Sequence, residues 1–202
     1  MSGKYEVTDI AHPDYPWLHR IRALRDVGND VHKGDLGGFV QGEDNLSQQG
    51  DCWLFGDAIV CEEALASQDA RICESVVIRS SALVSGKVCI NGNVVVEDHA
   101  IVMAGTISGD CFISGNACLA ENRKTGAAPT VIGQAAVYGT VCGSVLVSGS
   151  SVILPGIRID MPTLDVLEIK DGQTRIHRSK SSQQIAAPEL PEKRMRDSSP
   201  EH

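Results

Sequence analysis

The sequence predicts an all-β protein built around a parallel β-helix of the hexapeptide-repeat type. Every sixth residue from Leu54 to Val102 is apolar, and a small side chain stands four residues after each one. A period of six fits neither a helix, at 3.6 residues, nor an ordinary strand, at two, and is typical of stacked β-helix coils. Glycine, asparagine and aspartate collect between the rows, because tight corners need the left-handed conformation that they tolerate. The apolar row comprises Leu54, Val60, Ala66, Ile72, Ile78, Val84, Ile90, Val96 and Val102.

Beyond Val102 the repeat continues with changes of spacing. Three hexads make one coil of about 18 residues, and coils stack at the strand spacing of ~4.8 Å. The next three apolar residues come one position early, which indicates that a residue is missing around 104–105; they are Ile107, Ile113 and Leu119.

Residues 121–130 (ENRKTGAAPT) break the pattern and are expected to form a loop outside the coil. The repeat resumes with Val131 and Val137, for which Ala135 and Val141 are the expected small partners. It ends with Val147 and Ile153, before Pro155-Gly156.

Four parts follow from these patterns. Residues 1–51 are a capping segment, 52–156 the β-helix with its loop insertion, 157–177 a C-terminal hairpin around Asp171-Gly172, and 178–202 a disordered tail. A cap is expected because an open end would expose unpaired strand edges and apolar core. Within it we predict short strands at 5–8 and 18–24 and a glycine-rich turn at 34–40 (GDLGGFV).

Composition excludes several classes of protein. The formal net charge of −8 provides no basic surface for nucleic acid. The sequence has neither an apolar run long enough to span a bilayer nor a signal peptide, so we expect a cytoplasmic protein without membrane contacts. The seven cysteines form no CxxC pair and fall in packing positions, so we expect reduced thiols and no metal site.

Three N-terminal blocks carry a resemblance to a known family. Residues 18–26 (LHRIRALRD), 34–40 (GDLGGFV) and 45–53 (NLSQQGDCW) resemble the N-terminal module of YdcK-like proteins. The similarity extends loosely through the hexads to about residue 156 and leaves out the tail. It implies a single-stranded left-handed β-helix, an acyltransferase label, and the enterobacterial and phage setting of that family. The period alone leaves the hand open, and a right-handed coil like that of bactofilin-like filament proteins stays an alternative.

One histidine, His99, lies within the regular coils. Hexapeptide acyltransferases use a histidine as general base, and a base needs a partner that orients its ring. Counting by 18 places Glu63, Ser81 and His99 on one corner, with Asp98 adjoining, so Glu63 or Asp98 would orient His99. The alternative is a solvated turn histidine. A γ-carbonic anhydrase would need three coil histidines for zinc, and the others lie outside the coils: His12, His19, His32, His177 and His202.

Outward-facing residues suggest an interface. The residue before each inward one points out of the coil, and two faces thereby carry aliphatic ladders. One ladder contains Ile59, Val77 and Val95 and would continue to Ile113; the other contains Leu65, Leu83 and Ile101 and would continue to Leu119. Exposed strand faces favour β-branched residues in any case, which is the competing explanation.

Two functions therefore stay open. The first is a non-enzymatic oligomeric scaffold or binding protein without a cofactor, of phage or prophage origin. Its partners would be a second copy of itself, with a trimer favoured by analogy with other hexapeptide proteins, and a protein or small-molecule ligand. The second is an acyltransferase that uses acetyl-CoA or another acyl-CoA on a small hydroxyl or amine acceptor, with His99 as base and the 121–130 loop as a binding arm.

Overall fold

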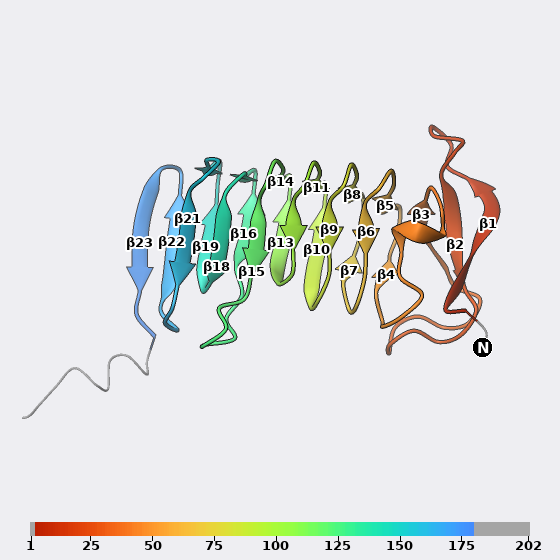
Figure 1. Cartoon of the computed structure of the whole chain (residues 1–202), viewed down its shortest axis with the longest axis horizontal. Coiled ribbons are helices and arrows are strands. Elements are labelled where there is room, and N and C mark those ends of the chain that lie inside the picture. The colour runs from red at the N-terminus through yellow and green to blue at the C-terminus, as the bar shows by residue number, and fades with distance from the viewer. Residues whose placement is uncertain (1–2, 180–202) are drawn as a thin grey trace, which may run out of the picture.

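A computed structural model of the chain describes residues 3–179. Residues 1–2 and 180–202, which include most of the tail for which we predict disorder, lie outside the described residues. The fold is all-β, with parallel coils stacked into a β-solenoid of about seven turns (Figure 1), which confirms the predicted fold class. One 3₁₀ helix, η1 (Glu43–Asn45), interrupts the described strands. No helix in residues 3–179 is long and apolar enough to cross a bilayer.

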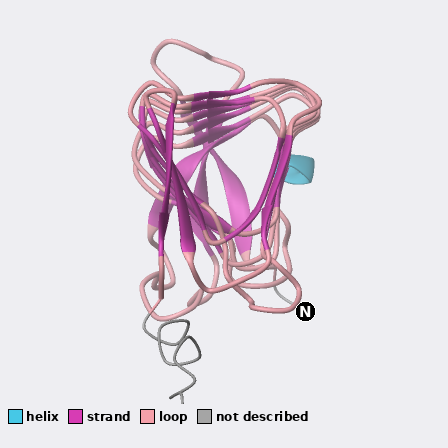
Figure 2. Cartoon of the chain, turned by 90° about the vertical axis from the view of Figure 1, so that its left-hand side faces the viewer, coloured by secondary structure: helices cyan, strands magenta, loops and turns pink. Residues whose placement is uncertain are grey.

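Three sheets surround the interior, as the view along the solenoid shows (Figure 2). The nine-stranded sheet contains, in spatial order, β1 (Tyr5–Ala11), β2 (His19–Ala23), β3 (Leu36–Val40), β5 (Ile59–Val60), β8 (Val77–Ile78), β11 (Val95–Val96), β14 (Phe112–Ile113), β17 (Ala136–Val137) and β20 (Val152–Ile153). The six-stranded sheet contains β6 (Leu65–Ala66), β9 (Leu83–Val84), β12 (Ile101–Val102), β15 (Cys118–Ala120), β18 (Thr140–Gly143) and β21 (Arg158–Met161). The eight-stranded sheet contains β4 (Trp53–Leu54), β7 (Arg71–Ile72), β10 (Val88–Gly92), β13 (Gly105–Gly109), β16 (Thr130–Gly133), β19 (Val145–Ser148), β22 (Val166–Lys170) and β23 (Gln173–His177).

The strand register confirms the repeat and its first change of spacing. Ile72 pairs with Ile90, eighteen residues on, whereas Ile90 pairs with Ile107, seventeen residues on. Ile107 then pairs with Val131, because residues 121–129 leave the coil between β15 and β16. These inward residues are fully buried and form a single core with the small residues between them.

Three predictions made from the repeat need correction. Val141 stacks on Leu119 and so belongs to the apolar row, because it follows Val137 at a spacing of four positions in place of six. Ile113 and Leu119 are buried, so neither can continue an outer ladder. The residues that do continue the ladders are Phe112 and Cys118, since the residue missing near 104–105 moves every later outward position by one.

The N-terminal cap is a β-meander that joins the solenoid edge. β1, β2 and β3 pair antiparallel, and β3 then pairs parallel with β5. The predicted turn at 34–40 is wrong for residues 36–40, which form β3. Its glycines serve close packing: a Cβ on Gly37 would lie 2.6 Å from Ile21 Cγ1, and one on Gly38 would lie 2.2 Å from Ala58 O.

At the C-terminal end the predicted hairpin is present. β22 and β23 pair antiparallel around Asp171-Gly172. The parallel stacking extends past residue 156, where the sequence pattern places its end, because β21 pairs with β18 and β22 pairs with β19.

Candidate functional site

His99 lies on the corner that links β11 to β12, directly after Asp98, whose backbone is left-handed at φ 59°. The edge between the nine-stranded and six-stranded sheets is called the His99 corner below. Along it, Ser81 Oγ donates to Glu63 Oε2 at 3.0 Å, and Ser81 N donates to Asp98 O at 2.9 Å. The structure therefore brings the three candidate catalytic residues to one exposed edge.

The carboxylate of Asp98 is directed at the following coil. Its Oδ2 accepts hydrogen bonds from Ser114 Oγ at 2.5 Å and from Gly115 N at 2.9 Å. These bonds, first the one from Ser114, hold the pKa of Asp98 below its usual range. Glu62 repeats the arrangement two coils earlier, where its Oε2 accepts from Ser80 N at 2.7 Å. Such carboxylates cap the amide of the next corner, which ties successive coils together.

The imidazole of His99 has no such support. Its side chain is exposed, and across residues 3–179 its ring makes no hydrogen bond. Glu63 is bonded to Ser81 and Asp98 to the next coil, and neither carboxylate is hydrogen-bonded to the His99 ring in the described residues. His99 is therefore an exposed edge residue in this structure, and its role as a general base stays a prediction.

The cysteines are buried or packed thiols. All seven are free, and burial raises the pKa of Cys52 to about 12, so this thiol stays protonated at neutral pH. No group of three or more histidine, cysteine, aspartate or glutamate side chains within residues 3–179 is arranged to hold a metal ion.

The loop of residues 121–129 stands beside the six-stranded sheet and creates two clefts. Asn122 anchors it: its Nδ2 donates to Asp160 Oδ1 at 2.9 Å, and its Oδ1 accepts from Lys124 N at 3.0 Å. One cleft, of about 670 Å³, has Lys87, Met103 and Arg123 in its lining. The other, of about 550 Å³, has Arg123, Lys124 and Arg158 in its lining. Cationic side chains therefore border both clefts together with carboxylates, which are Asp69 and Glu121 in the first cleft and Glu121 and Asp160 in the second.

The candidate interface residues divide into covered and uncovered positions. Ile59 is buried beneath Leu18 and Phe39 of the cap, so it cannot contact a partner. The other five face outward and are half-buried or exposed: Val77, Val95, Leu65, Leu83 and Ile101.

A projecting connection between β1 and β2 was not predicted as a site. Residues 12–18 rise above the nine-stranded sheet at the N-terminal end of the solenoid (Figure 1) and carry His12, Tyr15 and Trp17. His12 packs edge-on against Phe39, with ring centroids 4.6 Å apart, and the Tyr15 and Trp17 centroids are 5.5 Å apart. Beneath the connection lies a groove of about 220 Å³ that Tyr15 and Trp17 share with Val77 and other residues of the nine-stranded sheet. The signal in the sequence is three ring side chains within six residues of a chain that is only 4% aromatic.

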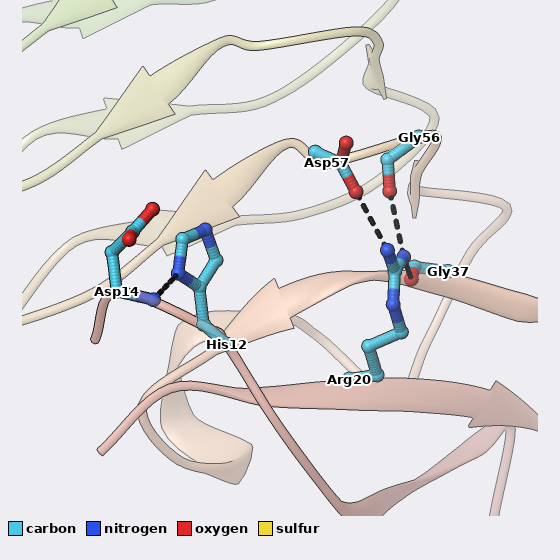
Figure 3. A network of polar contacts seen from close by, with 6 residues as sticks. All are labelled: His12, Asp14, Arg20, Gly37, Gly56 and Asp57. Atoms are coloured by element: carbon cyan, nitrogen blue, oxygen red, sulfur yellow. Dashed lines mark hydrogen bonds and ion pairs between the residues drawn. The ribbon is translucent and has the colours of Figure 1, made fainter. Parts of the chain in front are cut away.

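Arg20 fixes this cap to the first coil (Figure 3). Its guanidinium donates to Gly37 O at 2.9 Å, to Gly56 O at 3.0 Å and to Asp57 Oδ1 at 2.6 Å. The same group lies 4.3 Å from the centroid of the Phe39 ring. In the connection itself, His12 Nδ1 accepts from Asp14 N at 3.1 Å. These bonds therefore fix in place the part of the cap from which Tyr15 and Trp17 project.

No protein-family model and no curated protein matches this sequence.

Proposed function

We propose that this chain is a non-enzymatic β-solenoid scaffold that associates with further copies of itself and binds a partner or ligand on its outer surface. The observation that supports this is the distribution of polar and apolar groups. The carboxylates on the His99 corner are engaged in bonds between coils, whereas the outward residues of two sheets are largely apolar. Large apolar strips on a protein surface are usually covered by another surface. The YdcK-like relationship, the left-handed coil and the phage or prophage origin belong to the same proposal and rest on the three N-terminal blocks.

The alternative is a CoA-dependent acyltransferase. The clefts beside the 121–129 loop favour it, because Arg123, Lys124 and Arg158 could pair with the phosphates of CoA. The acyl group would pass from the CoA thioester to an acceptor hydroxyl or amine, and His99 would take the acceptor's proton.

Two measurements on the full chain separate these functions. Multi-angle light scattering at micromolar concentration is expected to give the mass of an oligomer, and calorimetric titration with CoA is expected to give no binding. A monomer would contradict the scaffold. CoA binding together with consumption of acetyl-CoA in the presence of an acceptor would replace the scaffold by the enzyme.

A further inference from the structure

The outer surface of the nine-stranded sheet is nearly free of net charge along the whole solenoid. Its outward side chains form two rows across six parallel strands. The only charged members are Arg79 and Glu97, and Arg79 Nε donates to Glu97 Oε2 at 2.7 Å, so they neutralise each other. The first row is Ile59, which Leu18 and Phe39 of the cap cover, followed by Val77, Val95, Phe112, Ala136 and Val152; the second is Cys61, Arg79, Glu97, Ser114, Tyr138 and Leu154.

At the N-terminal end of this surface the 12–18 connection projects above the sheet. Trp17 is 57% exposed and Tyr15 is 45% exposed, although both are large rings. Their groove includes Cys61, Glu62 and Arg79, so the rings stand on the side of the sheet that adjoins the His99 corner.

At the C-terminal end the same corner is hollowed. A cavity of about 400 Å³ lies between Gly115-Asn116 and Pro155-Gly156, with Tyr138 in its lining. It coincides with the coil that is two residues short, since Val141 follows Val137 by four residues and not by six. Around it Leu154 is 60% exposed and Ile157 is 48% exposed. One surface thus has a projecting aromatic pair at one end and a hollow with a mixed polar and apolar lining at the other, both on the same corner.

We propose, on the basis of the scaffold function above, that the occupant of this surface is a second copy of the chain, related by a two-fold axis that runs along the strands between β11 and β14. Such an axis reverses the solenoid direction but keeps the His99 corners of both copies on the same side. The 12–18 connection of each copy then meets the hollow of the other, and Trp17 enters the space beside Tyr138 and Pro155. The interface is isologous and closes with two copies.

The position of the axis determines which strand of one copy faces which strand of the other, and the side chains that meet are compatible in charge. β5 faces β20 of the other copy, β8 faces β17, and β11 faces β14. Arg79 therefore lies opposite Tyr138, where a cation–π contact is available, and no pair of like charges is brought together. The five strands that the cap leaves uncovered, at ~4.8 Å, and a coil side of about six residues at ~3.3 Å cover roughly 400–500 Å² of each copy. With the 12–18 connection added, this approaches the ~800 Å² per partner of a standard interface.

The test uses the full chain with two single variants matched in chemistry. Trp17→Glu places a charge on an exposed side chain at the proposed contact, and Leu83→Glu places one on the six-stranded sheet. We expect the wild type to be a dimer by light scattering, Trp17→Glu to raise the dissociation constant at least ~30-fold as for an aromatic hot spot, and Leu83→Glu to leave it unchanged. Circular dichroism melts check that both variants are folded.

A cross-link identifies the contact directly. A benzophenone amino acid at position 17, in a mixture of unlabelled and ¹⁵N-labelled chains, is expected to give mixed-isotope peptides that join residue 17 to residues 138–157. Cross-links between copies that map to the six-stranded sheet, a trimer, or dissociation by Leu83→Glu alone would overturn the two-fold interface while leaving the scaffold function standing. A monomeric wild type would overturn both.

Discussion

Replacing Gly86 by alanine tests how closely successive coils approach. Gly86 follows β9 on the corner between the six-stranded and eight-stranded sheets, with φ +75°. A Cβ there would lie 2.3 Å from Met103 O of the next coil, a distance at which something must shift. Gly56 is the matched control, because its φ is +66° but the nearest atom to its Cβ would be Glu74 N at 3.4 Å.

The two substitutions share one cost and differ in another. An alanine in the left-handed conformation destabilises the folded chain by ~1–2 kcal/mol. Alanine also has less conformational entropy than glycine in the unfolded chain, which favours folding by ~0.4–1 kcal/mol. The free energy of unfolding should therefore fall by about 1 kcal/mol in Gly56→Ala. Gly86→Ala adds an overpacking cost of ~1–3 kcal/mol, for a total of about 2–4 kcal/mol. For a chain of this size each kcal/mol lowers Tm by roughly 2–4 °C.

Urea titrations followed by far-UV circular dichroism give both free energies, and thermal melts give Tm. A loss for Gly86→Ala at least about 1 kcal/mol larger than for Gly56→Ala is expected from the overpacking range. Equal losses would mean that only the left-handed backbone matters, and the proposed coil-to-coil contact at Met103 O would be refuted.

Three further predictions concern the core and the His99 corner. Ile90→Ala removes a fully buried side chain and should cost ~2–5 kcal/mol in urea titrations, whereas Ile101→Ala, 37% exposed, should cost under about 1 kcal/mol; similar values would contradict the six-residue register. The pKa of Asp98 is lowered in the folded chain, so its ionised form stabilises the fold above the ordinary carboxyl pKa, and that contribution is lost as pH falls through the lower folded value. Asp98→Asn should therefore be less stable than the wild type at pH 7, with a gap that closes below about pH 4, and a gap independent of pH would argue against the bonds to the next coil. His99→Ala should leave Tm and oligomer mass unchanged, and any acyl-CoA turnover that fell ~10²-fold in this variant would show that the ring is a base after all.

Sequence reasoning predicts the solenoid well because its physical cause is local and repeated. An inward side chain every six residues fills a narrow interior, so the spacing alone predicts correctly that Ile72, Ile78 and Ile90 are buried. The corners are less predictable. Glu62, Gln68, Glu74 and Ser80 adopt left-handed backbones with φ between 58° and 62°, as Asp98 does at φ 59°, although of these five only aspartate is a residue type expected there. For Glu62 and Asp98, hydrogen bonds to the next coil offset that strain, and such bonds between residues 16–18 apart leave no mark in local composition.

The candidate site was harder to predict for the same physical reason. In a periodic fold every corner repeats, so the period itself stacks polar residues such as Glu63, Ser81 and His99, and their stacking alone does not distinguish a catalytic site from an ordinary corner. Departures from the six-residue period are more informative than stacked corner residues. They occur between strands, where they leave the core unchanged, and each one alters the outer surface. The 12–18 connection adds rings, the 121–129 loop adds cations beside two clefts, and the short coil at 138–140 opens a hollow. None of these is needed to close the core, which is continuous through all of them. Under the proposed scaffold function, binding is therefore expected where the repeat is interrupted, and the regular coils between those places would set the distance between the binding surfaces.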